Sequence, residues 1–196
     1  YRNTVLESGT YAGNQGQSPA SLMNYAEIKW TDIANGEGVR ISLFVSGCTH
    51  HCKNCFNEVA WDFAYGKSFD EAVREKILEG LSQSFIAGLS LLGGEPLEPQ
   101  NQRALLPFVA GVRERYPKKT IWAFSGFTYE ELTTEGTHAH CEITEELLSL
   151  IDVLVDGRFV EAKKDISLRF RGSSNQRIID LRKTRETNSV VLWNEK

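Results

Sequence analysis

Apolar residues along this chain fall into short β-rich runs separated by stretches of helical periodicity. The β-rich runs are residues 39–45, 86–94, 120–124 and 152–156, and the helical stretches are residues 68–83, 100–115 and 143–150. Strands that recur between helices are typical of parallel βαβ units, in which each crossover helix packs back on the sheet. The pattern therefore predicts an α/β fold with a largely parallel sheet.

The helix predicted at 68–83 has the clearest pattern. Ser68 is the predicted N-cap because Glu71 follows three residues later, as in a capping box. The apolar residues of this stretch share one helical face: Phe69, Val73, Ile77, Leu78 and Leu81. We expect this face to pack against the sheet.

The remaining segments carry weaker patterns. Residues 23–30 begin as a strand would, residues 133–142 are expected to form a loop, and short strands are predicted near 177–180 and 190–193. Residues 1–22 are rich in Gly, Ser, Asn and Gln and are expected to form a flexible extension, native or foreign to the protein. Because one domain commonly takes roughly 100–200 residues, residues 23–196 are expected to form a single domain.

Composition and the first residues indicate where in the cell the protein is located. Hydrophobic residues make up 41% of the chain and charged residues 24%, and no apolar run approaches the ~18 residues that a membrane span requires. The first residues also lack the basic start and apolar stretch of a signal peptide. We therefore expect a cytoplasmic protein without a membrane segment, in which clustered cysteines more often serve metal binding or catalysis than disulfides.

Charge is distributed unevenly along the chain. The formal net charge is −4, yet residues 158–185 hold nine Lys or Arg against three Asp or Glu. This basic segment predicts contact with an acidic partner or an anionic ligand, and the alternative is an ordinary solvated surface. Nucleic acid is not expected, because no aromatic-rich basic repeat or known binding motif accompanies the charge.

Three of the four cysteines lie in one short loop. Cys48, Cys52 and Cys55 have the spacing C-x3-C-x2-C. Structural zinc usually takes four ligands in two separated pairs, and here Cys141 or a histidine would have to complete the site. A [4Fe–4S] cluster also commonly takes four thiolates, so three on one loop would leave one iron open. Spacing alone favours a cluster but keeps zinc as an alternative.

The loops after the next strands add polar and glycine residues. Gly93, Gly94 and Glu95 follow the strand at 86–94, where glycines allow a ligand to approach the backbone and the carboxylate suits an ammonium group. "SGF" follows the third strand and "DGRF" the fourth. Since ligands of parallel sheets bind at the carboxyl ends of the strands, we expect all four loops to form one site.

"CTHHCKNC" followed by "GGEP" resembles the radical S-adenosylmethionine superfamily. One departure is Asn54, where that superfamily usually has an aromatic residue, although Phe56 is near. "NGEGVRISLFVSGCTHHCKNCFN", "LLGGEPL", "WAFSGFTYEEL", "IDVLVDGRF" and "RFRGSSNQRIIDL" more closely resemble the activating proteins of anaerobic ribonucleoside-triphosphate reductase, over about 160 residues. "DGRF" and "RGSSNQRIID" separate this family from the related glycyl-radical enzyme activases.

The resemblance implies a function and a set of cofactors. Cys48, Cys52 and Cys55 would hold a [4Fe–4S] cluster whose fourth iron is chelated by S-adenosylmethionine. An electron from a flavodoxin-like donor would cleave S-adenosylmethionine to a 5′-deoxyadenosyl radical, which removes hydrogen from a glycine loop of the reductase large subunit. The fold implied is an incomplete TIM-like βα barrel of the radical S-adenosylmethionine type, because a full barrel needs roughly 250 residues.

The resemblance also suggests roles for residues around the cofactor. Gly93, Gly94 and Glu95 would receive the methionine ammonium group. Further contacts with the cofactor are expected, with less support from the residues themselves, from Asp156, Arg158, Ser125 and Gly126.

Other residues near these motifs have open roles. Cys141 would be a bystander, because a fourth thiolate would block the open iron. His50 and His51 would either hydrogen-bond cluster sulfurs or lie on the surface. The segment 172–177 would contact the cofactor edge or the partner, or form a structural turn.

Two rival functions remain at this stage. The first is a zinc-binding interaction module, which would be colourless. The second is a radical enzyme that modifies a different protein or a small molecule.

Overall fold

A computed structural model of the chain describes residues 23–55 and 57–194. The expected extension at residues 1–22 and the residue Phe56 lie outside the described residues. Across the described part, no helix combines the length and apolar character needed to cross a bilayer.

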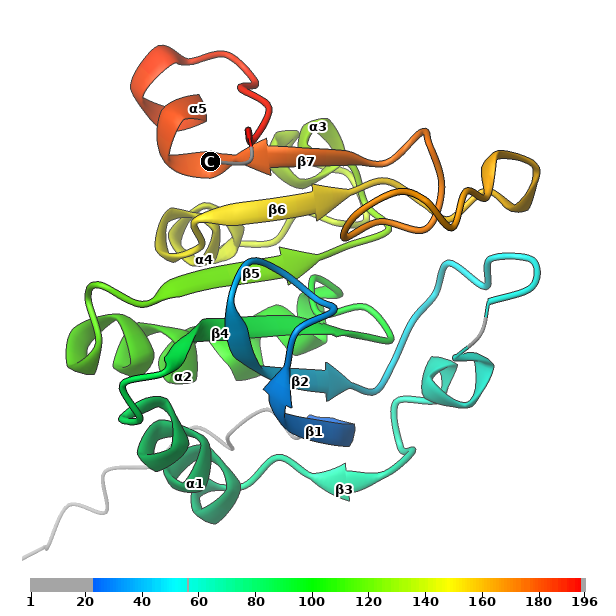
Figure 1. Cartoon of the computed structure of the whole chain (residues 1–196). Coiled ribbons are helices and arrows are strands. Elements are labelled where there is room, and N and C mark those ends of the chain that lie inside the picture. The colour runs from blue at the N-terminus through cyan, green and yellow to red at the C-terminus, as the bar shows by residue number, and fades with distance from the viewer. Residues whose placement is uncertain (1–22, 56, 195–196) are drawn as a thin grey trace, which may run out of the picture.

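Seven strands form one open sheet in this part of the chain (Figure 1). They are β1 (Asn24–Asp32), β2 (Val39–Val45), β3 (Lys67–Ser68), β4 (Ile86–Gly93), β5 (Thr120–Phe124), β6 (Val153–Asp156) and β7 (Arg177–Asp180), in the spatial order β3-β1-β2-β4-β5-β6-β7. The central strands β2, β4, β5 and β6 are parallel, as predicted, whereas β1 and β7 pair antiparallel with their neighbours. The carboxyl ends of the four central strands therefore meet at one edge.

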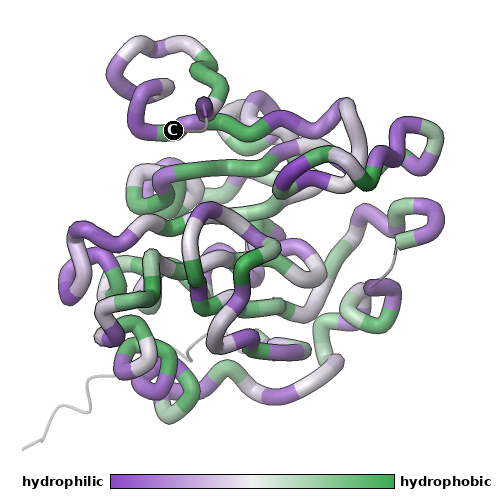
Figure 2. The backbone as a smooth tube through the Cα atoms, viewed as in Figure 1, coloured by the Kyte–Doolittle hydropathy of each residue, from purple (hydrophilic) through white to green (hydrophobic). Residues whose placement is uncertain are grey.

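Helices cover one face of this sheet. The α-helices are α1 (Glu71–Leu81), α2 (Pro99–Arg115), α3 (Tyr129–Thr133), α4 (Thr144–Leu150) and α5 (Leu181–Thr187), and the 3₁₀ helices are η1 (Glu58–Trp61) and η2 (Glu161–Lys163). In Figure 1, α2 and α4 lie behind the strands, and they pack on each other. Figure 2 shows apolar positions along the central strands and a mostly polar α5.

The two faces of the sheet have different chemistry because side chains alternate along each strand. Ile41, Leu43, Leu89 and Leu91 are fully or almost fully buried in the core beneath the helices. On the other face a smaller, aromatic-rich cluster contains Trp122 with Val153 and Val155, packed against Phe124, Phe170, Ile178 and Trp193. We call this second face the inner face.

A buried arginine occupies the inner face near the amino ends of the strands. Arg40 donates hydrogen bonds to Ser90 Oγ (2.7 Å), to the hydroxyl of Thr120 (2.9 Å) and to the carbonyl oxygen of Leu89 (2.8 Å). Its guanidinium group also lies over the ring of Trp122, 5.6 Å from the centroid. Burial lowers the pKa of Arg40 to about 10. Hydrogen bonds and an aromatic face thus replace a carboxylate partner.

The predicted pattern of α1 is confirmed except at its first residue. Phe69, Ile77, Leu78 and Leu81 are buried and Val73 packs against them. The N-cap is Asp70, whose carboxylate accepts a hydrogen bond from Val73 N (3.0 Å), so the prediction of Ser68 was wrong. Ser68 instead lies in β3, where it pairs with Asn24 of β1 and is therefore outside the helix.

At the carboxyl terminus only one of the two predicted strands joins the sheet. Residues 177–180 form β7, as predicted. The predicted strand at 190–193 is reduced to one antiparallel bridge between Ile179 and Leu192. The intervening helix α5, which the apolar pattern did not predict, carries the chain across this edge.

Candidate functional site

A cavity of about 420 Å³ opens at the carboxyl edge of the parallel strands. Each of the four predicted loops contributes to its wall: Cys48 after β2, Gly94 after β4, Ser125 after β5 and Gly157 after β6. The prediction that these loops share one edge is confirmed. We call this space the cysteine cavity, because it is also lined by Cys52 and Cys55.

The three cysteines of the loop differ in exposure. Cys48 is buried, with 8% of its surface exposed, whereas Cys52 and Cys55 are partly exposed, and all three are free thiols. Burial raises the pKa of Cys48 to about 12 and also raises the pKa of Cys52. A raised pKa favours the protonated thiol, so Cys48 and Cys52 would lose protons on binding a metal.

The three thiols lie on one loop and line the same cavity. Among the described residues, no three His, Cys, Asp or Glu side chains converge as the ligands of one metal ion do. Cluster thiolates bind different irons and need not converge on one point. Three thiols on the wall of a largely apolar cavity are compatible with that larger ligand.

Glu95 anchors the start of the cysteine loop from beneath. Its carboxylate is fully buried and accepts hydrogen bonds from Ser125 Oγ (2.8 Å), Gly126 N (2.7 Å) and Leu97 N (2.8 Å). The ring nitrogen Nε2 of His50 lies 2.7 Å from the same group. The carboxylate thus joins three of the loops around the cavity, although Glu95 itself is not among the lining residues.

The glycines next to Glu95 allow the strand end to approach the cysteine loop closely. A Cβ atom on Gly94 would lie 2.7 Å from the carbonyl oxygens of Ala60 and Gly47, and Gly93 has a φ of +111° that favours glycine. Gly47 O in turn accepts a hydrogen bond from Glu95 N (2.8 Å). Gly93 and Gly94 both line the cysteine cavity, so their backbone faces the ligand space.

Ser125 and Gly126 also line the cavity. Ser125 Oγ donates to Glu95 and accepts a hydrogen bond from Phe127 N (3.0 Å). A Cβ atom on Gly126 would lie 2.5 Å from the ring of His50, so a larger residue there would displace the histidine.

A second buried acid, Glu98, anchors the cysteine loop one residue earlier. Its Oε1 accepts hydrogen bonds from Thr49 N (2.8 Å) and Thr49 Oγ1 (2.5 Å), and its Oε2 lies 3.0 Å from His138 Nε2. Glu98 was not predicted from the sequence, which offered His138 only as one of four histidines that could complete a zinc site. The only sequence signal is that Glu98 lies three residues after Glu95, at the start of a helix.

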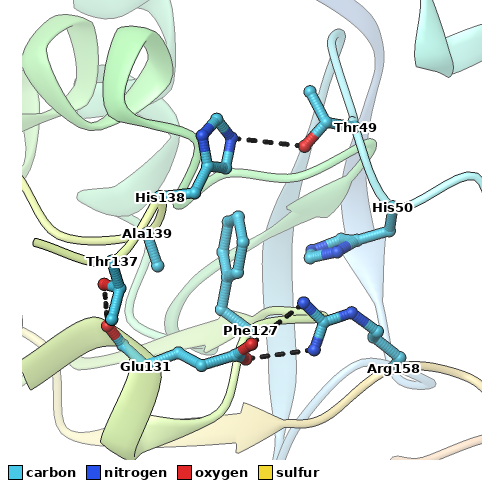
Figure 3. Close-up of a pocket in the computed structure, with 8 residues that line it drawn as sticks. All are labelled: Thr49, His50, Phe127, Glu131, Thr137, His138, Ala139 and Arg158. Carbon is cyan, nitrogen blue, oxygen red and sulfur yellow. Dashed lines mark hydrogen bonds and ion pairs between the residues drawn. The ribbon is translucent and has the colours of Figure 1, made fainter. Parts of the chain in front are cut away.

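These contacts surround a second, smaller cavity of about 240 Å³ (Figure 3). In the figure, His138 points toward Thr49, and Phe127 lies between His138 and the pair formed by Arg158 and Glu131. The ring of His50 packs edge-on against Phe127 at 4.3 Å and lines both cavities. His50 is therefore a wall between the two spaces rather than a surface histidine.

Asp156 and Arg158 lie beside the cysteine cavity but are not among its lining residues. Asp156 is buried and accepts hydrogen bonds from Arg177 Nε (3.0 Å), Arg177 Nη2 (2.5 Å) and Tyr129 N (2.7 Å). Arg158 instead forms two hydrogen bonds with Glu131. The side chains of both residues are thus engaged by protein groups.

The segment 171–177 fastens the carboxyl-terminal part of the chain to the loop after β6. Gln176 Nε2 donates to Gly157 O (2.9 Å), and Asn175 Nδ2 donates to Arg158 O (2.9 Å). Gln176 also lines the cysteine cavity, together with Arg171 and Gly172. The segment is therefore a structural turn that also borders the cavity.

The remaining candidates lie apart from the cavity. Cys141 is buried, with its sulfur 3.5 Å from Gln102 Oε1 and 3.4 Å from Thr144 Oγ1, and it does not line the cysteine cavity. His51 stacks on Trp61 with ring centroids 4.4 Å apart.

A family model described as a 4Fe-4S single cluster domain matches residues 34–179, so the chain belongs to the single-cluster class of iron–sulfur proteins. A relative from Pasteurella multocida is 46% identical over 156 residues, covering 79% of this chain and 95% of the relative. A relative from Escherichia coli K12 is 41% identical over 162 residues, covering 82% of this chain and all of the relative. Both are named anaerobic ribonucleoside-triphosphate reductase-activating protein, and this chain belongs to that family.

Proposed function

We propose that this chain is an activase that holds a [4Fe–4S] cluster through Cys48, Cys52 and Cys55 and generates a glycyl radical on anaerobic ribonucleoside-triphosphate reductase. One observation carries the proposal: these three free thiols line one cavity, while Cys141 is packed elsewhere. With S-adenosylmethionine bound, such a cluster would supply reductive cleavage of the S–C5′ bond, the chemistry that yields methionine and the 5′-deoxyadenosyl radical needed to take hydrogen from the target glycine.

The residues of the chain bind and orient the cofactor in this proposal. The backbone of Gly93 and Gly94 receives the methionine portion, and Ser125 and Gly126 lie beside the ribose. Support comes from the position of all four residues on the cavity wall. Glu95 contributes in one of two ways. It accepts a hydrogen bond from the ammonium group after one of its present donors leaves, or it holds Ser125 and Gly126 in place.

Asp156 and Arg158 are also proposed to contribute to binding the cofactor. Direct contact of Asp156 with the cofactor requires the carboxylate to leave Arg177, with which it forms two hydrogen bonds. The same holds for Arg158 and Glu131. In the geometry described, both residues therefore position the loop after β6.

A polypeptide target fits the rim of the cysteine cavity. Ile33, Val59 and Ile166 are exposed apolar residues in three different segments, and each lies within two residues along the chain of a residue on the cavity wall. Exposed apolar residues around a cavity mouth favour contact with another protein. We propose that the glycine loop of the reductase large subunit enters here, and that the open sheet serves as an incomplete βα barrel that this partner covers.

The electron source and the compartment complete the proposal. A flavodoxin-like protein is the proposed donor, and the cytoplasm is the proposed location. Free thiols at all four cysteines are compatible with a reducing compartment.

The test is anaerobic reconstitution with iron and sulfide, followed by reduction in the presence of S-adenosylmethionine and chromatographic measurement of 5′-deoxyadenosine. We expect product from the wild type and from the control Cys141→Ala, and none from Cys48→Ala. A colourless protein that binds zinc stoichiometrically and makes no product would replace the proposal with a zinc-binding interaction module.

A second arm identifies the target. The reductase is added, and the glycyl radical is followed by electron paramagnetic resonance. Product without a radical on the reductase would retain the cofactor chemistry but assign it to another protein or small molecule.

A further inference from the structure

A third cavity, of about 260 Å³, lies at the opposite edge of the sheet from the cysteines. Its position follows from β5, which begins at Thr120 in this cavity and ends next to Ser125 in the cysteine cavity. The ionisable residues of its lining are Arg113, Lys118, Lys119, Arg182, Arg185 and Asp152. Two of them, Arg182 and Arg185, belong to the basic segment that the sequence singled out. We call this space the basic cavity.

Backbone carbonyl groups hold two of the arginines in place. Arg113 donates to the carbonyl oxygens of Lys119 (3.1 Å) and Leu150 (2.7 Å), and Arg185 donates to that of Leu148 (3.1 Å). Leu148 and Leu150 lie in the last turn of α4, and Leu148 O also accepts a hydrogen bond from Ile151 N (3.2 Å). These bonds fix the guanidinium groups without cancelling their charge.

One carboxylate cannot neutralise this set of cations. Asp152 Oδ2 accepts from Arg113 Nη2 (2.7 Å) and from Ile121 N (2.8 Å). Arg182 Nε lies 3.7 Å from Asp152 Oδ1, which is longer than a hydrogen bond. Five cationic side chains therefore face one acidic one, in a chain whose formal net charge is −4.

The two lysines add positive charge from the turn between α2 and β5. Lys119 Nζ donates to the carbonyl oxygens of Gln83 (3.0 Å) and Ile86 (2.6 Å), and burial lowers its pKa. Lys118 is exposed and forms no hydrogen bond or ion pair with the described residues. Mutual repulsion among fixed cations is relieved most directly by a bound anion.

We propose that the basic cavity binds the phosphoryl group of a small anionic molecule. Guanidinium groups match phosphate geometry and lysine ammonium groups add point charge, which is the combination present here. Pockets for drug-sized ligands run from roughly 300 to 1,000 Å³, so a cavity of about 260 Å³ suits one phosphate or diphosphate group rather than a whole larger ligand. This site is independent of the cluster chemistry proposed above.

The experiment is calorimetric titration of the anaerobic, cluster-loaded protein with inorganic phosphate, diphosphate and ATP, each at low and moderate salt. The test variant is Lys118→Gln with Arg182→Gln, because neither side chain holds the surrounding backbone in the described contacts. The control is Lys67→Gln with Lys76→Gln, which removes the same net charge from exposed positions elsewhere.

We expect saturable binding of at least one of the three anions that weakens with salt. The double variant should weaken it by about tenfold for each charge-assisted contact removed, whereas the control should leave it nearly unchanged. A preference for ATP over diphosphate would assign a nucleotide, and equal affinities would assign the phosphate group alone.

Two results would overturn the proposal. The first is an absence of saturable binding by the wild type for all three anions. The second is equal weakening in the test variant and the control, which would show a response to overall charge only. Unchanged melting of both variants without anion checks that the fold is retained.

Discussion

Two walls of the cysteine cavity, the cysteine loop and the carboxyl-terminal segment 157–177, are held by different chemistry. The cysteine loop is fastened by Glu95 and Glu98, which are buried and accept mainly from backbone and hydroxyl groups. The segment 157–177 is fastened largely by arginine–carboxylate pairs that reach the surface. Buried neutral donors are little affected by salt, whereas exposed ion pairs are screened. The cysteine loop should therefore be rigid, whereas the segment 157–177 should loosen when salt screens its ion pairs.

The largest expected effect comes from removing the rigid anchor. Glu95→Ala leaves Ser125 Oγ, Gly126 N and Leu97 N without their acceptor in a buried site, which should destabilise the protein by about 3 kcal/mol or more. Denaturant unfolding followed by tryptophan fluorescence measures this loss, and iron content after reconstitution measures damage to the loop.

Glu95→Gln is the matched control. It keeps one acceptor oxygen, so it should cost clearly less than the alanine variant and retain more iron. Equal losses in both variants would mean that the negative charge, rather than the hydrogen bonds, holds the loop.

The next effect concerns the second wall. Arg177→Gln removes both hydrogen bonds to Asp156 and leaves that buried carboxylate with Tyr129 N, at an expected cost of about 2 kcal/mol. Limited proteolysis should then cut within 157–177 sooner than in the wild type, with the iron content largely retained. Proteolysis that begins in the cysteine loop instead would contradict the comparison.

A smaller effect is expected at the other rigid anchor. Glu98→Gln keeps an acceptor for Thr49 but weakens its charge-assisted bonds, so the expected loss is about 1 kcal/mol. The iron content of the reconstituted variant should stay close to that of the wild type. Complete loss of iron would show that the charge of Glu98, beyond its hydrogen bonds, is needed near Cys48.

The smallest effect is a response of the second wall to acid. Hydrogen bonds from Arg177 lower the pKa of Glu130, and hydrogen bonds from Arg158 lower the pKa of Glu131, in both cases from an ordinary value of 4.5. A lowered folded pKa contributes stability that is present above pH 4.5 and is lost as the pH falls through the folded value.

The double variant Glu130→Gln, Glu131→Gln should remove this part of the acid dependence. The measurement is the unfolding free energy of the wild type and the variant at several pH values at low salt. Identical pH profiles would mean that these pairs do not hold the segment.

Much of the fold was predictable because each central strand is an apolar run bounded by turn residues. The same order of strands and loops predicted that Cys48, Gly94, Ser125 and Gly157 meet at one edge, and they do. The helix α3 was missed although its signal was present: Thr128 and Glu131 form a capping box.

Other features carried no comparable signal. The helix α5 has the short polar sequence LRKTRET, without an extended apolar face. The contact between Glu98 and His138 joins residues 40 positions apart, so it depends on how the loop after α3 packs against α2. The hydrogen bonds between Arg177 and Asp156 likewise depend on tertiary structure, because strand pairing between β6 and β7 brings the two residues together.

Because the three thiols differ in exposure, air should oxidise them in a definite order. Oxidants reach the partly exposed Cys52 and Cys55 before Cys48, of which 8% is exposed. Early injury should therefore stop at sulfenic acid or a disulfide between the two outer cysteines, which thiol reductants reverse. Cys48 should then remain a reduced thiol.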